Sequence, residues 1–85
     1  MDYLFKTTHE ELDAEVFRAR TKFPGNALLL TALMEEVGEL AKAYLQKADV
    51  ASIRAEALQV ACVALRIYEE GDPTYSDMTE DQAKP

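Results

Sequence analysis

The sequence predicts an all-α protein with three main helices, and three observations support this. Ala, Leu, Glu and Lys dominate the composition, whereas Val, Ile and Thr are sparse. No stretch shows the strict alternation of apolar and polar residues that is typical of a half-buried strand. Turn-forming residues interrupt the chain near Pro24 and Pro73, with a short polar link at 47–49 between them.

The first helix is expected from Thr8 to about Thr21. The residues from Thr8 to Glu11 fit a capping box, in which Thr8 is the N-cap and the Glu11 side chain reaches back to it. The apolar positions of this helix follow helical spacing: Leu12, Val16, Ala19. Pro24 disfavours helical backbone at the residue before it, so the helix should end there.

The second helix is expected from Ala27 to Gln46, with Asn26 as its N-cap. The third is expected from Val50 to Glu70, capped by Asp49 or Ser52 and ended by Gly71. Its segment 57–65 holds one polar residue in nine and is therefore expected to be buried nearly all round. Residues 1–71 then form one helical domain, and residues 72–85 form an acidic tail that is loose or pinned to a partner subunit.

Composition and charge restrict the function. The 85 residues hold 16 acidic and 9 basic side chains, a net charge of -7, which argues against binding to nucleic acid or to an anionic membrane. The single Cys62 excludes an internal disulfide and a cysteine-based zinc site. A reducing cytoplasm is the expected compartment, since neither a signal peptide nor an apolar run of about 20 residues is visible.

Some of the acidic residues lie where solubility does not explain them. On a helical wheel, Glu36 falls on an apolar face of the second helix, among Leu29, Leu33, Leu40 and Ala43. Glu39 lies at the edge of that face, whereas Glu35 belongs to the polar stripe. In the third helix, Glu56 and Gln59 share the face of its branched apolar residues. A carboxylate on a buried face is costly unless it is paired, protonated or bound to metal.

The two polar pairs, Glu36/Glu39 and Glu56/Gln59, face each other if the second and third helices pack antiparallel, as their short link favours. Oxygen ligands without His or Cys suit a hard cation, Mg²⁺ or Mn²⁺. Because Mg²⁺ commonly completes its shell with substrate phosphates, this pattern indicates nucleotide phosphate chemistry. The alternative is an ordinary hydrogen bond between helices.

The stretch from Phe23 to Leu40 resembles the MazG-like all-α NTP pyrophosphohydrolases, including the dCTP-pyrophosphatase-like and dimeric dUTPase-like branches. That family carries ExxE on one helix and ExxD on the next. Here Glu36–Glu39 supplies ExxE, and Glu56–Gln59 occupies the ExxD position. Pro24-Gly25-Asn26 matches the family's entry to the first of these helices, and the resemblance covers roughly residues 12 to 70.

The resemblance implies a four-helix-bundle-like core formed by homodimerisation of the second and third helices, with tetramers possible. It implies Mg²⁺-dependent hydrolysis of the α–β phosphoanhydride of a (deoxy)nucleoside triphosphate to the monophosphate and pyrophosphate. Glu36, Glu39 and Glu56 would be metal ligands, with Gln59 in the fourth position, and Glu35 is a candidate to orient the attacking water. The candidate substrate contacts are Lys22, Phe23, Asn26, Tyr44 and Arg54.

Gln59 departs from the family pattern, because an amide offers a carbonyl oxygen but no charge. Three interpretations therefore stay open at this point: an active pyrophosphohydrolase, a degenerate nucleotide- or metal-binding or regulatory module without turnover, and a structural dimer. In the last, Glu36 and Glu56 would pair with Arg54 or Lys42. A nearly all-apolar third helix in so short a chain also predicts a homodimer on physical grounds.

Overall fold

The computed structural model describes residues 2–74, with side chains from residue 8 onward. This part of the chain contains three helices and no strand: α1 (Asp2–Lys22), α2 (Leu29–Leu45) and α3 (Val50–Glu70). The prediction of an all-α chain with three main helices is confirmed. Among the described residues, no helix has both the length and the apolar character that crossing a membrane requires.

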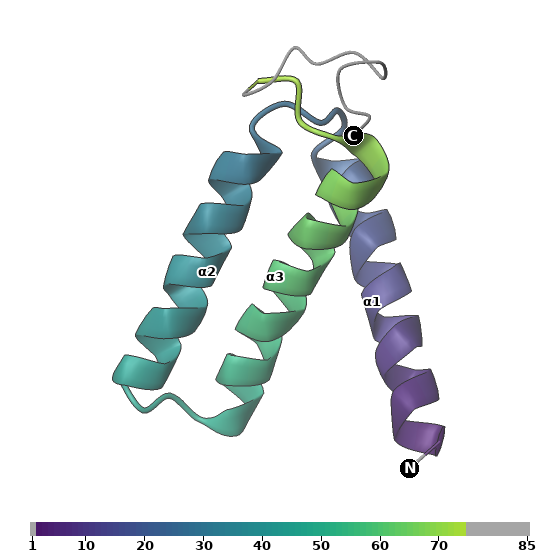
Figure 1. Cartoon of the computed structure of the whole chain (residues 1–85). Helices are drawn as coiled ribbons and strands as arrows, with labels where there is room; N and C mark the ends of the chain where they lie inside the picture. The colour runs from purple at the N-terminus through teal and green to yellow at the C-terminus, as the bar shows by residue number, and fades with distance from the viewer. Residues whose placement is uncertain (1, 75–85) are drawn as a thin grey trace, which may run out of the picture.

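Helix α3 is the central element. It runs antiparallel to α2 and in the same direction as α1 (Figure 1). Both α1 and α2 pack against α3, whereas the described parts of α1 and α2 do not pack against each other. α1 meets α3 near the C-terminal ends of both helices and diverges from it toward the N-terminus (Figure 1). The end of the molecule at which α1 and α3 meet is therefore the only place where all three helices come together in the described structure.

Helix α1 is longer than predicted. It begins at Asp2, so Thr8 lies inside the helix and the predicted capping box is wrong. No Gly or Pro stands between these two residues, and a helix that has nucleated extends in either direction at little cost until such a residue stops it. The predicted end is confirmed, because α1 stops at Lys22, just before the Phe23-Pro24 pair.

Helix α2 begins at Leu29, two residues later than predicted, and Asn26 does not cap it. Its N-cap is Leu28, which adopts a left-handed backbone conformation with φ 65° and makes no side-chain cap hydrogen bond. The Asn26 amide instead donates to the backbone carbonyl of Glu70, 2.6 Å away. The residue types at this turn favoured a local cap, but the amide is used to hold the end of α3.

The cap of α2 comes from a distant part of the chain. Asp72 accepts hydrogen bonds from the backbone N–H groups of Leu28 at 3.2 Å and Leu30 at 2.7 Å. Thr74 Oγ1 accepts a further bond from Leu28 N at 2.9 Å. The first residues of the predicted acidic tail are thus attached to the N-terminus of α2 in the same chain, and residues 75–85 lie outside the described structure.

Helix α3 agrees with the prediction at both ends. Asp49 is its N-cap and accepts a hydrogen bond from Ser52 N at 2.8 Å. Gly71 ends it with φ 73°, a conformation that L residues with a side chain rarely adopt, and its N–H donates to the Ile67 carbonyl. These caps are local in sequence, which is why the spacing alone predicts them.

The apolar core is small. Its buried apolar residues number three among those described, one from each helix: Val16, Leu29 and Cys62. The Cys62 thiol is fully buried, as the sequence predicts for a small apolar side chain, and burial raises its pKa. The expectation that residues 57–65 are buried nearly all round is wrong for the single chain, because α3 has neighbours on two sides only. Three small residues of this segment are exposed: Ala57, Ala61 and Ala64. Ala57 and Ala61 line an open cleft between α3 and the N-terminal half of α1.

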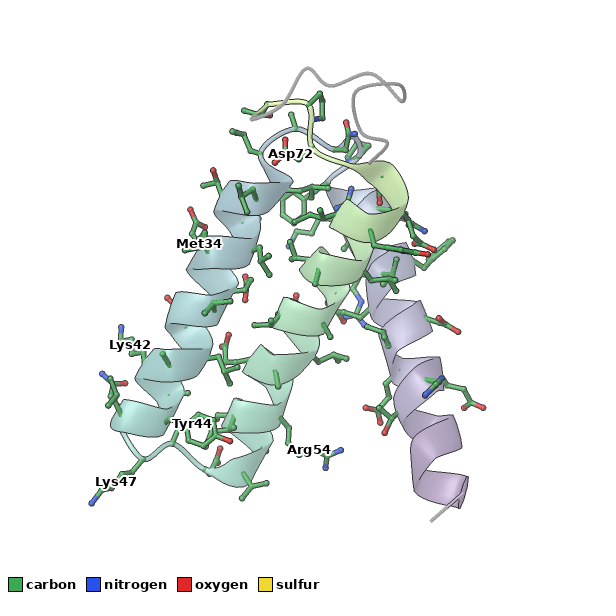
Figure 2. The ribbon with its side chains drawn as sticks, in the orientation of Figure 1. Met34, Lys42, Tyr44, Lys47, Arg54 and Asp72 are labelled. Atoms are coloured by element: carbon green, nitrogen blue, oxygen red, sulfur yellow. The ribbon has the colours of Figure 1, made fainter. Side chains whose placement is uncertain are left out.

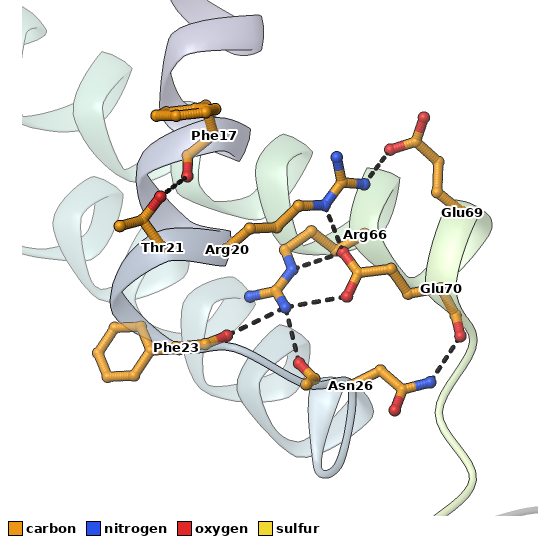
Figure 3. A network of polar contacts seen from close by, with 9 residues as sticks. Phe17, Arg20, Thr21, Phe23, Asn26, Arg66, Glu69 and Glu70 are labelled. Atoms are coloured by element: carbon orange, nitrogen blue, oxygen red, sulfur yellow. Dashed lines mark hydrogen bonds and ion pairs between the residues drawn. The ribbon is translucent and has the colours of Figure 1, made fainter.

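A buried arginine joins the helices where they meet. Arg66 is 3% exposed, and its guanidinium donates to both carboxylate oxygens of Glu70 at 2.9 and 3.0 Å (Figure 3). The same group donates to the backbone carbonyls of Phe23 at 3.2 Å and Gly25 at 2.7 Å. Arg20 of α1 adds a hydrogen bond to Glu70 at 2.7 Å. We call these residues the Arg66 cluster.

Hydrogen bonds from Arg66, supplemented by Arg20, lower the pKa of Glu70 from its ordinary value to about 2. A lowered pKa in the folded state means that the ionised carboxylate stabilises the fold. This contribution is complete above the carboxyl's ordinary pKa, and it is lost as the pH falls from about 4.5 toward 2.

We therefore expect Glu70→Gln to lower the free energy of unfolding at neutral pH by about 1–3 kcal/mol, because it leaves Arg66 buried without its carboxylate. The variant should also lose most of the acid sensitivity of the parent. Urea unfolding between pH 7 and pH 3 measures both effects. Glu69→Gln is the control, since the ion-pair partner of Glu69 among the described residues is Arg20, which is exposed. Equal acid sensitivity in the parent and in Glu70→Gln would contradict this interpretation.

Candidate functional site

A pocket of about 500 Å³ lies where the three helices come together. Its lining comes from α1, from the loop that follows α1, and from α2 and α3. The pocket brings together four residues that the sequence singles out, Glu36, Gln59, Lys22 and Phe23. Arg66 also lines it, so the pocket shares a wall with the Arg66 cluster.

Glu36 is a pocket residue whose carboxyl has a raised pKa. Its side chain is half-buried on the side of α2 that faces α3, as the helical wheel predicts. Burial raises the pKa of this carboxyl, and repulsion from Glu56, Glu39 and Glu35 raises it further. The ion pairs of the described residues involve neither Glu36 nor Glu56. The pairing with Arg54 or Lys42 that a purely structural role would require is therefore not formed in the single chain.

Gln59 is engaged by a residue that the sequence analysis missed. Its Nε2 donates to Glu15 Oε2 of α1 at 2.6 Å, and Glu15 is 7% exposed. Arg18 lies one turn further along α1 and contacts the other carboxylate oxygen at 2.8 Å. On the helical wheel Glu15 lies next to Leu12 and Ala19, at the edge of the apolar face of α1, so the test that singles out Glu36 and Glu39 also points to it.

The four predicted metal residues are distributed unevenly. Glu36 and Gln59 line the pocket, whereas Glu56 is half-buried outside it and Glu39 is exposed on α2. Glu35, the candidate for orienting water, is also exposed. The carboxylates of Glu35, Glu39 and Glu56 each repel that of Glu36, but of these four side chains Glu36 alone lines the pocket.

Of the predicted substrate contacts, the pocket contains Lys22 and Phe23, with Lys22 Nζ 5.3 Å from the centre of the Phe23 ring. Asn26 lies in the adjoining loop and is held by Glu70. Tyr44 and Arg54 lie at the opposite end of the α2–α3 pair (Figure 2).

Tyr44 is ~18 Å along α2 from the pocket residue Ala32. Arg54 lines a separate cleft between the N-terminal half of α1 and α3. One chain therefore does not bring Tyr44 or Arg54 to the same small ligand as Lys22 and Phe23.

Whether these residues suit a metal ion can be judged from their chemistry and from their positions. The available groups are oxygen ligands, and Glu36 carries a charge that no cation among the described residues offsets, which suits a hard divalent ion. In the described part of the chain, however, no three Asp, Glu, His or Cys side chains are gathered closely enough to hold one. The site fits a cation in charge and ligand type, but its ligands do not converge.

Comparison with known proteins adds no assignment: no family model, no curated protein and no solved structure matches this chain. The function is therefore inferred from the residues and from their arrangement.

The raised pKa of Glu36 predicts that its charge destabilises the metal-free protein. The pH dependence of stability is opposite to that of Glu70, because the pKa of Glu36 is raised in the folded state. The stability that protonated Glu36 contributes is complete below its ordinary pKa, and it is lost as the pH rises through the raised pKa. We expect Glu36→Gln to raise the Tm at pH 7 by a few degrees in the presence of a chelator. Glu35→Gln, at the exposed neighbouring position, should change it less. A lower Tm for Glu36→Gln than for the parent would show that the ionised Glu36 carboxylate stabilises the metal-free fold, and it would contradict this prediction.

Proposed function

We propose that this chain is a metal-dependent nucleotide pyrophosphohydrolase that cleaves the α–β phosphoanhydride of a (deoxy)nucleoside triphosphate. The products would be the nucleoside monophosphate and pyrophosphate. The observation that supports this best is Glu36, a half-buried carboxylate that forms no ion pair with the described residues and is repelled by Glu56, Glu39 and Glu35. Such an arrangement costs stability, and a bound cation is the simplest benefit that offsets the cost.

In this proposal, Glu36, Glu39 and Glu56 hold Mg²⁺ or Mn²⁺ together with the amide oxygen of Gln59. The bound ion would neutralise the phosphate charge and polarise the α-phosphate. Glu35, exposed beside Glu36, is assigned the orientation of the attacking water.

The substrate is assigned to the pocket end at which Lys22 and Phe23 lie. The Lys22 ammonium would contact a phosphate, and the Phe23 ring offers a face on which a base can stack. Asn26 is assigned a positioning role, because its bond to the Glu70 carbonyl holds the loop that carries Phe23. Tyr44 and Arg54 would contact this substrate only if a second copy of the chain delivered them.

We also propose that the protein is a homodimer, with further assembly to a tetramer possible. α2 has an exposed stripe of large apolar side chains at helical spacing: Leu30, Met34, Val37 and Leu45. On α3, the small residues Ala57, Ala61 and Ala64 are also exposed. Surface of this kind on a chain with so small a core favours burial against a second copy.

The second candidate is a nucleotide- or metal-binding module without turnover. It is favoured by the neutral Gln59 and by the absence of three converging carboxylates in the described structure. The two candidates predict the same ligand and differ in whether product is released.

The decisive measurement is release of pyrophosphate from a panel of NTPs and dNTPs with Mg²⁺ or Mn²⁺. We expect turnover of at least one substrate, reduced at least about 100-fold in Glu36→Gln and Glu56→Gln because each loses a proposed metal ligand. Glu10→Gln, an exposed change on α1, is the control and should retain parental activity. Nucleotide-dependent stabilisation without product would favour the binding module. If the folded protein shows neither stabilisation nor product, both candidates are rejected.

The dimer is tested separately by light scattering at micromolar concentration. The parent should have twice the chain mass, and Met34→Glu should have the mass of one chain, because it places a charge in the middle of the exposed apolar stripe on α2. Lys42→Glu changes the charge by more. Lys42 lies on the polar side of α2 with Glu35, Glu39 and Gln46, so this variant should leave the dimer intact. A monomeric parent would contradict the proposal.

A further inference from the structure

We infer that Arg18 is a phosphate-binding residue of the pocket, and that Arg18 and Lys22 together bind the polyphosphate part of the substrate from the α1 side. The inference rests on the proposed function. It adds a residue that lies outside the ExxE and ExxD-like segments. We call Arg18 and Lys22 the α1 cation pair.

The α1 side of the pocket carries more positive than negative charge. Arg18 and Lys22 both line the pocket, and their i, i+4 spacing places them on one face of α1, with Cβ atoms about 6 Å apart. The acidic residue that α1 contributes to the same lining is Glu15, and the other acidic lining residue, Glu36, belongs to α2. Because the whole chain has a net charge of -7, a local excess of cations is unusual for its surface and favours an anionic ligand there.

The fold holds Arg18 at the pocket through one of its nitrogens. Arg18 Nη2 contacts Glu15 Oε1 at 2.8 Å, and Glu15 Oε2 accepts a hydrogen bond from Gln59 at 2.6 Å. Because both oxygens of this 7% exposed carboxylate have partners, Glu15 fixes the position of the Arg18 side chain.

The Arg18 guanidinium keeps donors for a ligand. A guanidinium has five N–H donors in a planar fork, and its side chain here is 66% exposed. It can therefore bind a phosphate with one edge while Glu15 holds the other. Phosphate suits this geometry, because its oxygens accept parallel hydrogen bonds from a guanidinium.

The third cation in the pocket lining is already neutralised within the fold. Arg66 is 3% exposed and donates to both carboxylate oxygens of Glu70. Lys22 differs from it, because it is exposed and takes part in none of the ion pairs of the described residues. The charge available to an anion in this pocket is therefore that of the α1 cation pair.

The pocket continues from the α1 cation pair to an apolar wall. Lys22 Nζ lies 5.3 Å from the centre of the Phe23 ring, and Leu29, Ala32 and Val63 also line the pocket. A ligand that joins several phosphates to a flat apolar group would contact both parts of this lining. A nucleoside triphosphate has this chemistry, whereas a free phosphate would use the α1 cation pair alone.

The test measures binding of inorganic tripolyphosphate to the full chain by isothermal titration calorimetry, in the presence of a chelator so that no metal contributes. Arg18→Gln and Lys22→Gln each remove one cation. The double variant Glu15→Gln/Arg18→Gln removes one charge of each sign, so it keeps the net charge of the parent, and its new glutamine can still accept from Gln59. Lys47→Gln is the control for the loss of one positive charge, because Lys47 is exposed at the far end of the α2–α3 pair (Figure 2).

We expect the parent to bind tripolyphosphate saturably and these three variants to bind it at least about tenfold more weakly, the effect of losing one hydrogen bond to a charged group. Lys47→Gln should bind like the parent. Weak binding by the double variant is the most informative result, because non-specific attraction follows net charge, which this variant leaves unchanged. For a nucleotide that is turned over, Arg18→Gln should raise KM by a similar factor and change kcat less.

The outcomes separate this inference from the proposed function. If nucleotides are hydrolysed with the same KM by the parent and by Arg18→Gln, the role of Arg18 is overturned and the proposed function stands. If tripolyphosphate binding shows the expected losses but no nucleotide is hydrolysed, the phosphate site stands and the hydrolase is rejected. A parent that shows no saturable binding at millimolar tripolyphosphate overturns the inference. If Arg18→Gln does not fold because Glu15 is left buried without its ion pair, the double variant decides: weak binding supports the inference, and parental binding overturns it.

Discussion

The structure depends on one buried cation, the guanidinium of Arg66. It satisfies the carbonyls of Phe23 and Gly25, where the chain leaves α1, and it binds Glu70 at the end of α3. The hydrogen bond from Asn26 to the Glu70 carbonyl supports the same connection between α1 and α2. The apolar core adds one buried residue per helix among the described residues. A buried ion pair adds little net stability compared with apolar packing, but the loss of one partner is costly. The Arg66 cluster therefore determines how the helices are arranged more than it raises the free energy of unfolding.

The pocket follows from that arrangement. The Arg66 cluster fixes the end of α1 and the loop after it, and this places Phe23 and Glu15 opposite α2. In the described structure α1 and α2 do not pack directly, and residues of both line the pocket together with residues of α3. The Glu36 carboxylate at this pocket opposes folding, since burial and the neighbouring carboxylates raise its pKa. Residues that reduce stability at a pocket are the ones most readily explained by function.

The helices were largely predictable because their signals are local. Asp49 caps α3 through a residue three positions away, and Gly71 ends it by its own backbone freedom. Pro24 ends α1 through its immediate neighbour. The predictions that failed concern helix starts. Thr8 did not begin α1, because the helix extends past it toward the N-terminus. Asn26 does not accept from the N–H groups of α2, and its amide donates to the Glu70 carbonyl of α3.

By itself, the sequence determined the helical class and most helix ends, and it identified Glu36 as an acid on an apolar face, because periodicity and capping act within a few residues. Only the tertiary structure decided which side chains meet. It placed Tyr44 and Arg54 away from Lys22, and it paired Gln59 with a residue 44 positions earlier. It also supplied the cap of α2 from the other end of the chain. Contacts at such separations depend on how the helices dock, and no spacing within a single helix encodes that.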